Sequence, residues 1–292
     1  MHYFCAIDIG GTYIKYALLG ENEKTYQHSK VKTPKNINNN IMKQVKQIIN
    51  YCSSNKKIKG IGVSTAGIVD REKGKVIYAG PTIQNYSGTD IKKELFNCYN
   101  VPVFVENDVK AALLGELWKG SVGFDKDNVF CLTIGTGIGG AYFNNELIDG
   151  DNLQANSIGY MLYDKKSKTN YEMRASTSAL SSIIKKKYGD NTDIKDVFAY
   201  AKNGNVDCNL IIKNWSEEIA KGISNIILLL DPSYIIIGGG VSAQGDFLLK
   251  HIKDKIGAFL PRGFWKTEIT IAKLANDAAI YGAVSPFFVK SI

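Results

Sequence analysis

Histidine is scarce in this chain of 292 residues, which limits the chemistry to be expected of it. The three histidines stand far apart, and none lies beside another or beside a cysteine with which it could share a metal (His2, His28 and His251). A zinc site is therefore not expected. None of the three is placed to form an evident Ser–His–Asp triad either.

Closely spaced cysteines and long apolar runs are also missing. The five cysteines are widely separated and include no C-x-x-C pair (Cys5, Cys52, Cys98, Cys131 and Cys208). An odd number at such spacing favours reduced thiols in the cytosol, most of them filling a core. No apolar run approaches the ~20 residues of a membrane helix, and no basic region with a small-residue cleavage site precedes Asp8. We expect a cytoplasmic protein with no membrane partner.

Positive charge is in excess but is not concentrated. The formal net charge is +8, from 36 Lys and Arg against 28 Asp and Glu. The lysines are spread over predicted helix faces and loops, as at 165–168 and 185–187. We interpret them as a solvated surface, compatible with a modest attraction for anionic small molecules such as nucleotides. No nucleic-acid partner is expected, because such binding favours clustered charge and a recognisable motif.

Glycine, by contrast, occurs in clusters. Residues 132–145 read LTIGTGIGGAYFNN, in which Gly135, Gly137 and Gly140 match the dinucleotide pattern G-x-G-x-x-G. That pattern needs a strand before it and a helix after it. A strand precedes it, but residues 141–145 read as a short strand and a turn. Two strands joined by a glycine bend are therefore predicted. A plain hairpin is the alternative, although four glycines indicate that something large approaches the backbone.

The same strand–bend–strand pattern opens the chain. A strand over 3–7 meets Gly10-Gly11-Thr12 and re-emerges over 14–19. Strands and helices then alternate, which predicts an α/β fold, with strands at 58–64, 101–105 and 234–237 and helices at 41–52, 109–119, 209–230, 247–259 and 277–289. The repeated opening predicts two related domains, 1–119 and 120–276, with a cleft between them. The C-terminal segment 277–292 is a candidate to rejoin the first domain, and one continuous sheet is the alternative.

Asp8 ends the first predicted strand beside Gly10, Gly11 and Thr12. Glycines let backbone N–H groups approach a phosphate, and a threonine can add a hydrogen bond. A carboxylate there would repel phosphate unless a cation intervenes, and Mg²⁺ accepts one or two carboxylates together with phosphates. Asp8 therefore either interacts with a phosphate-bound Mg²⁺ or is only a turn residue after the strand. Lys15 either reaches a phosphate or faces outward from its strand.

Two later glycine clusters suit the same ligand. Gly135-Thr136-Gly137 is expected to face the first bend, so that the two bends grip a phosphate chain from both sides. Gly238-Gly239-Gly240 follows a buried strand and suits close backbone approach to a nucleoside, with tight packing as the rival explanation.

Glu106-Asn107-Asp108 joins a predicted strand to a predicted helix. Aspartate is a common helix cap, and capping alone would explain Asp108. A carboxylate at a helix start near a phosphate site can also accept the proton of an attacking hydroxyl. Asn107 beside it can orient that hydroxyl.

Taken together, these motifs resemble the ROK family of bacterial sugar kinases and repressors, over nearly the whole chain. The stretches that carry the resemblance follow the family's order: DIGGTYIK (8–15), GVSTAGIVD (62–70), VENDVKAALLGE (105–116), LTIGTGIGGAY (132–142), IIIGGGVS (235–242) and NDAAIYGA (276–283). The resemblance implies an actin-like, RNase H-like fold of two duplicated domains. It also implies ATP, Mg²⁺ and phosphorylation of a sugar hydroxyl, with a homodimer as the assembly.

The resemblance also assigns roles to residues. It implies that Asp108 is the general base that takes the proton of the sugar 6-hydroxyl as it attacks the γ-phosphate. Around ATP it places Asp8, Gly10, Gly11, Thr12, Thr136, Gly137 and Gly239. Along the sugar it places Gly67, Asn85, Asn107, Asp108 and Glu172.

Two departures from the family pattern bear on the sugar pocket. Where the family commonly has Glu-x-Gly-His, this chain has Ser157-Ile158-Gly159-Tyr160. The cysteine-rich zinc loop is missing, because residues 166–174 contain no cysteine. We therefore expect no zinc and a changed set of sugar contacts at Ser157 and Tyr160, while Glu172 still matches the glutamate that closes that loop.

Within the family, the zinc-less N-acetylmannosamine kinases are the most similar. The likeness lies in AGPTIQNYSGT (79–89), the ending GGAY (139–142), IGYMLY (158–163) and EMRASTSAL (172–180). β-Glucoside kinases share a Gly-Tyr-Met segment and are the alternative, and glucokinase is a third. A transcriptional regulator is disfavoured because Asp8 leaves no room for a preceding helix-turn-helix, and a non-catalytic sugar sensor because Asp8, Asp108 and both bends are retained.

Overall fold

The computed structural model describes residues 1–80 and 83–289, so Pro81 and Thr82 of the 79–89 stretch and residues 290–292 lie outside the description. The chain divides into two compact units. The first comprises Met1–Phe124, Asp149–Gln154 and Asp277–Ile292, and the second comprises Asp125–Ile148 and Ala155–Asn276. The first unit therefore runs past the predicted boundary near 119 and also takes in a short segment from the middle of the chain.

The first unit is built on a five-stranded sheet in the order β3-β2-β1-β4-β7. Strands β1 to β3 are antiparallel neighbours, whereas β4 and β7 run parallel to β1. The strands are β1 (Tyr3–Ile9), β2 (Tyr13–Gly20), β3 (Thr25–Lys32), β4 (Ile58–Thr65) and β7 (Val103–Asn107), with β5 (Ile68–Asp70) and β6 (Lys75–Tyr78) forming a separate ribbon. The helices are α1 (Asn40–Ser53), α2 (Ile91–Tyr99), α3 (Asp108–Lys119) and α9 (Ala278–Val284).

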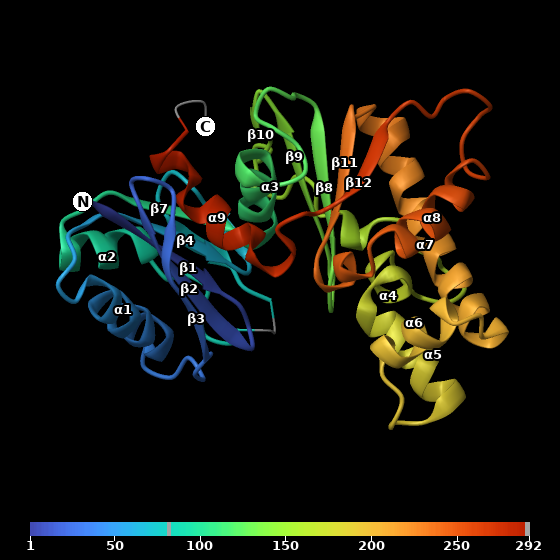
Figure 1. The fold of residues 1–292 in the computed structure, drawn as a ribbon, viewed down its shortest axis with the longest axis horizontal. Coiled ribbons are helices and arrows are strands. Elements are labelled where there is room, and N and C mark those ends of the chain that lie inside the picture. Colours follow the sequence, from blue (N-terminus) through green and yellow to red (C-terminus); the bar gives the residue numbers. More distant parts are fainter. Residues whose placement is uncertain (81–82, 290–292) are drawn as a thin grey trace. The chain divides into compact units, whose positions relative to one another are not determined.

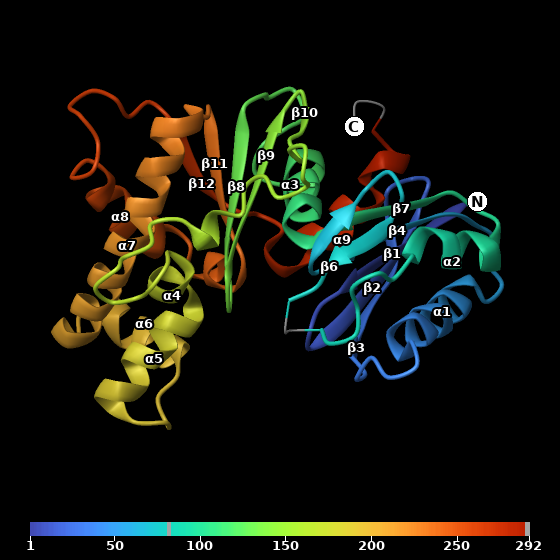
Figure 2. The ribbon, with the colours of Figure 1, turned by 180° about the vertical axis from the view of Figure 1, so that it is seen from behind.

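Alternation along β1 explains why helices cover both faces of this sheet. Cys5 and Ile7 point into a core shared with α1 and α2, whereas Phe4 and Ala6 pack with Ile280 of α9 on the other face. Successive strand residues face opposite sides of a sheet, so a strand that is apolar throughout must be covered twice. Figures 1 and 2 show α1 and α2 beside one face and α9 beside the other, with α3 packed against α9.

The second unit repeats this topology in the order β10-β9-β8-β11-β12. Its strands are β8 (Val129–Ile134), β9 (Ile138–Asn144), β10 (Glu146–Leu147), β11 (Tyr234–Gly238) and β12 (Glu268–Ile271). Its helices are α4 (Glu172–Ala175), α5 (Thr177–Tyr188), α6 (Ile194–Lys202), α7 (Val206–Leu230) and α8 (Asp246–Ile256). Phe130 and Leu132 of β8 pack with Trp215 and Ile219 of α7 in the core. Two sheets of one topology confirm the predicted duplicated α/β fold, and the alternative of one continuous sheet is wrong.

Several boundaries differ from those predicted. The sequence predicts a last helix over 277–289, but α9 ends at Val284 and a 3₁₀ turn, Ser285–Phe287, follows. Pro286 explains this change, because proline has no N–H to continue the helix. No helix in the described ranges, 1–80 and 83–289, combines the length and the apolarity that a membrane crossing requires.

Candidate active site

The turn from β7 into α3 carries the predicted base. Asn107 caps the helix, since its side-chain oxygen accepts hydrogen bonds from the backbone N–H groups of Val109 (3.0 Å) and Lys110 (3.2 Å). The Asn107 side-chain amide donates to Gly67 O and to Asp108 Oδ1, both at 2.9 Å. Asn107, rather than Asp108, is thus the cap, and Asp108 is left as the first helical residue beside it.

The two oxygens of Asp108 have different surroundings. Oδ1 accepts hydrogen bonds from Asn107 and from the Val109 N–H (2.9 Å), whereas Oδ2 accepts none within residues 1–80 and 83–289. Burial, and then the charge of Asp8, raise the pKa of Asp108 to about 6. A carboxylate with that pKa is ionised near neutrality and yet basic enough to take a proton.

This raised pKa predicts how stability changes with pH. The folded state holds the Asp108 proton more tightly than an unfolded chain with the ordinary value of 3.8. The contribution of Asp108 to wild-type stability therefore declines from about pH 4 to about pH 6, because the unfolded chain has released this proton while the folded state still holds it. We expect Asp108→Asn, which stays neutral, to gain up to about 2 kcal/mol over wild type between pH 4 and pH 8. Urea unfolding at pH 4 and pH 8 measures the free energy of unfolding of both proteins. A difference between variant and wild type that is the same at both pH values would contradict this prediction.

Asp8 is held where β1 meets β2. Lys15 Nζ lies 3.1 Å from Asp8 Oδ2, and Ser64 of β4 donates to Asp8 Oδ1 at 2.9 Å. Lys15 is therefore paired with Asp8 across the hairpin rather than simply facing outward. Gly10 closes the bend through its N–H to Tyr13 O (3.0 Å).

These groups fit a magnesium nucleotide. Asp8 supplies a carboxylate of the kind that hydrated Mg²⁺ accepts, and Lys15 supplies a cation for phosphate. Thr12 at the tip of the bend is exposed, and Gly10 and Gly11 are partly exposed, so their backbone can be approached.

The bend of the second unit has the predicted strand–bend–strand form. Gly135 N–H donates to Gly137 O at 2.9 Å, and β9 rather than a helix follows. Thr136 at the tip is exposed, and its carbonyl accepts a hydrogen bond from Ser178 Oγ (2.8 Å). The start of α5 thus lies against the bend, an element that the sequence did not indicate.

Glu172 lies on this bend as well. Its Oε2 accepts a hydrogen bond from the Ile138 N–H at 2.8 Å, and a Cβ at Gly137 would lie 2.5 Å from the same oxygen. Gly159 packs against the same side chain, and Tyr160 beyond it is 72% exposed. Exposed Ser157 begins that turn, since its carbonyl accepts from the Tyr160 N–H at 3.2 Å. Glu172 thus connects the glycine bend with the segment that carries Ser157 and Tyr160.

Gly239 and Asn85, predicted to contact the nucleotide and the sugar, also have structural roles within their own loops. Gly239 has φ +85°, and a Cβ there would overlap the backbone of Ile134, so close packing already requires glycine. Gly240 has open space around it and is exposed. Asn85 lies in a separate loop, with its carbonyl bonded to Asn36 Nδ2 at 2.7 Å.

The loop that replaces the zinc loop is held by hydrogen bonds. Arg174 donates to Thr169 O (2.9 Å) and to Leu162 O (2.7 Å), and its Nε pairs with Glu218 of α7 at 3.0 Å. Asp164 accepts from the Ser167 hydroxyl at 2.6 Å. Within the described residues no group of three or more His, Cys, Asp or Glu side chains is placed to hold a metal ion.

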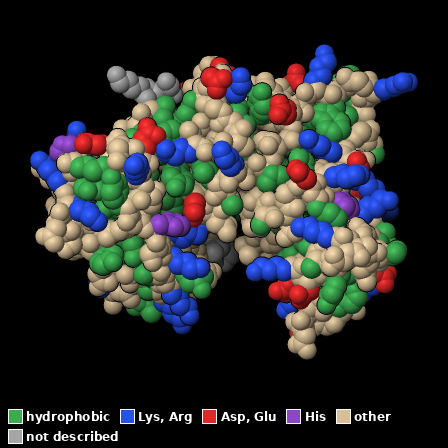
Figure 3. Space-filling model, viewed as in Figure 1, with side chains coloured by type: hydrophobic (Ala, Val, Ile, Leu, Met, Phe, Trp, Pro, Cys, Tyr) green, Lys and Arg blue, Asp and Glu red, His purple; other side chains and the backbone are tan. Residues whose placement is uncertain are grey.

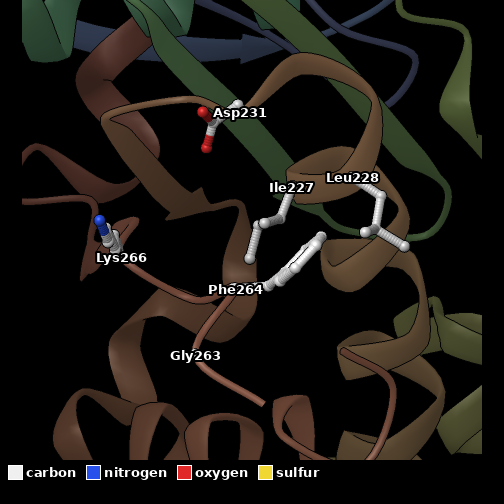
Figure 4. A pocket seen from close by; sticks show the side chains of 6 residues that line it. All are labelled: Ile227, Leu228, Asp231, Gly263, Phe264 and Lys266. Carbon is white, nitrogen blue, oxygen red and sulfur yellow. The ribbon is translucent and has the colours of Figure 1, made fainter. Parts of the chain in front are cut away.

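Features away from these residues are less specific. Lys and Arg side chains are dispersed over the face shown in Figure 3 rather than gathered in one patch. A cavity of about 400 Å³ lies at the end of α7 (Figure 4), lined by Ile227, Leu228, Asp231, Gly263, Phe264 and Lys266. None of the predicted catalytic or binding residues is among them, and we assign this cavity no role in the chemistry of Asp8 and Asp108.

Paired sheets of one topology, a glycine bend after the first strand of each, and an aspartate opening a helix define the actin-like class of two-unit α/β proteins. The ROK family model matches residues 4–287, and the chain belongs to the ROK family. The predicted resemblance is thereby confirmed.

Relatives with described activities cover almost the whole chain. A β-glucoside kinase of Listeria monocytogenes is 30% identical over 97% of this chain and 96% of its own. A solved Listeria monocytogenes protein, provisionally described as an N-acetylmannosamine kinase, is 27% identical with a TM-score of 0.87, over 99% and 100%. A ROK family glucokinase from Streptomyces griseus, solved with glucose and AMPPNP, is 26% identical with a TM-score of 0.83, over 97% and 98%.

Proposed function

We propose that this ROK sugar kinase transfers the γ-phosphoryl group of ATP to the 6-hydroxyl of a hexose derivative, and that N-acetylmannosamine is its preferred sugar. The observation that carries the proposal is Asp108 at the start of α3, with a pKa of about 6 and one oxygen not hydrogen-bonded by the described residues. The nucleotide-bound glucokinase relative supports ATP as the phosphoryl donor.

In the proposed reaction, Asp108 Oδ2 accepts the proton of the sugar 6-hydroxyl as the hydroxyl oxygen attacks the γ-phosphorus of ATP. The bond between that phosphorus and the β,γ-bridging oxygen breaks, and ADP leaves. The hydrogen bonds from Asn107 and Val109 fix Oδ1 and therefore aim Oδ2. Asn107, Gly67 and Asn85 are proposed to bind the sugar, together with Ser157, Tyr160 and Glu172. General-base catalysis of this kind typically contributes 10²–10⁴-fold to a rate.

Bound MgATP supplies the phosphoryl group, and its Mg²⁺ offsets the charge of the phosphates. We propose that Asp8 and Lys15 hold the metal and phosphates, together with the backbone of Gly10, Gly11 and Thr12. The second unit is proposed to contribute Thr136, Gly137 and Gly239. The working protein is proposed to be a cytoplasmic homodimer, by likeness to the family.

The identity of the sugar is the finer part of the proposal. The stretch IGYMLY (158–163), which contains Tyr160, resembles the zinc-less N-acetylmannosamine kinases, and a structural relative is provisionally described as such a kinase. A β-glucoside is the second candidate, because the β-glucoside kinase relative is 30% identical. Both sugars present a primary 6-hydroxyl, so the reaction itself does not discriminate between them.

A panel of sugars in a coupled ADP-release assay tests this choice. With ATP and Mg²⁺, we expect kcat/KM for N-acetylmannosamine to exceed those for N-acetylglucosamine, glucose and cellobiose by at least about tenfold, a difference of about 1.4 kcal/mol in transition-state binding. A much higher value for glucose or cellobiose would overturn the sugar assignment but leave the kinase assignment intact. No phosphorylation of any sugar would overturn both.

A further inference from the structure

Glu106 is a buried carboxylate that the proposed reaction does not use. It directly precedes Asn107, and its side chain is fully buried. Oε1 accepts a hydrogen bond from the Asn107 backbone N–H at 2.7 Å. Oε2 is buried and has no hydrogen-bond partner in the described part of the chain. Burying a carboxylate oxygen without a partner is costly, so this arrangement calls for an explanation.

Two cations lie near Glu106, but another carboxylate holds them more closely. Arg71 Nε is 3.8 Å from Glu106 Oε2, which is an ion-pair distance but longer than a hydrogen bond. The same guanidinium lies 3.0 Å from Asp149 Oδ2, and Lys110 Nζ pairs with Asp149 Oδ1. Asp149 therefore takes the closer contacts of both cations and leaves Glu106 incompletely neutralised.

The surroundings of Glu106 place its ionisation near neutrality. Burial raises the pKa of Glu106 to about 7; Lys110 and Arg71 oppose that rise, and Asp149 adds to it. These groups come from three places: Lys110 from α3, Arg71 from the turn after β5, and Asp149 from the Asp149–Gln154 segment. Without the charge of Asp149, Arg71 and Lys110 could both interact more closely with Glu106, which would lower the pKa of Glu106.

The connection to the base runs through one residue. Glu106 holds the Asn107 backbone N–H, and the Asn107 side chain holds Asp108 Oδ1 and Gly67 O. A hydrogen bond to an ionised acceptor is shorter and stronger than one to a neutral acceptor. The Asn107 backbone is thus held more firmly when Glu106 is ionised.

We infer that Glu106 is a positioning residue for the base: ionised Glu106 fixes Asn107, Asn107 aims Asp108, and Asp149 regulates that ionisation by competing for Arg71 and Lys110. This inference rests on the proposed role of Asp108. If it holds, the rate of the proposed reaction is regulated by pH and by the Asp149–Gln154 segment.

The test compares kcat across pH in wild type, Glu106→Gln, Asp149→Asn and Asp151→Asn, with the best sugar from the panel. Asp151 is exposed on the same segment, so its substitution is the matched control for a lost negative charge. We expect wild-type kcat to rise with pH in two steps, one for Asp108 and one for Glu106. Asp149→Asn is expected to move the Glu106 step to lower pH by about one unit, while Asp151→Asn leaves it in place.

Glu106→Gln is expected to abolish that step and to lower kcat above neutral pH by about tenfold, because the Asn107 N–H then meets a neutral acceptor. A merely structural role would lower kcat without removing or moving a step. An unmoved or upward-moved midpoint in Asp149→Asn would overturn the inference, as would a wild-type profile in Glu106→Gln.

An infrared titration separates this inference from the proposed function. The wild-type minus Glu106→Gln difference spectrum is expected to contain the carbonyl band of a protonated carboxylic acid, which disappears as pH rises through neutrality. In the Asp149→Asn background that disappearance is expected at lower pH. If no sugar is phosphorylated, the proposed function fails, while this titration still tests the competition between Asp149 and Glu106. A band absent at acidic pH, or unmoved by Asp149→Asn, would overturn that competition.

Discussion

Asp108→Asn is expected to fold, to bind sugar and to lose kcat by at least about 100-fold. Asparagine keeps an oxygen that can accept from Asn107 and Val109, the two donors that hold Asp108 Oδ1. Its amide nitrogen replaces Oδ2 and cannot take a proton from a hydroxyl. The substitution therefore removes the proposed base while leaving shape and hydrogen bonds nearly unchanged.

The matched control is another aspartate at a helix start in the same unit. Asp90 caps α2 by accepting a hydrogen bond from the Lys93 N–H at 3.1 Å. Asp90→Asn is expected to keep kcat within about twofold of wild type, since asparagine is an equally good cap. Calorimetric sugar binding and a coupled kinase assay on both variants measure the difference. Near-normal turnover of Asp108→Asn would remove Asp108 as the base.

Gly282→Ala is expected to destabilise the protein by about 3 kcal/mol or more, because α3 and α9 meet backbone to backbone. A Cβ at Gly282 of α9 would overlap the carbonyl oxygen of Ala111 in α3. A Cβ at Gly115 of α3 would likewise overlap the carbonyl oxygen of Ala278. Two backbones cannot move apart locally, so the variant must displace the helix that begins with Asp108.

The control for this substitution is Gly257, which follows α8. Its φ of −61° is helical, and a Cβ there meets nothing within 4 Å. Gly257→Ala is expected to change the free energy of unfolding by less than about 1 kcal/mol, with a gain as the favoured sign. Urea unfolding measures the free energy of unfolding of both variants. Similar values would show that α3 and α9 can move apart to admit a methyl group, contrary to the prediction.

The sequence predicted the fold where local pattern and burial agree. The two glycine bends between strands and the strand that leads into the helix at Asp108 are readable because glycine, apolar runs and capping residues act over a few neighbours. The edge strand β3 was not predicted, because its residues, TYQHSKVK, are mostly exposed and show little apolar alternation. The last helix ends earlier than residue 289, because Pro286 has no N–H to continue it.

What the sequence determined by itself is the duplicated α/β fold, the family and the candidate residues on the two bends and at the start of α3. What only the tertiary structure decided is which charges meet. The Glu172 side chain contacts the glycine bend, which lies some 35 residues earlier in the chain. One cluster of charges brings together four side chains from separate places in the sequence: Arg71, Glu106, Lys110 and Asp149. The energy of a charge interaction depends on the distance between the charges and on their burial. Neither quantity can be deduced from the spacing of residues along the chain.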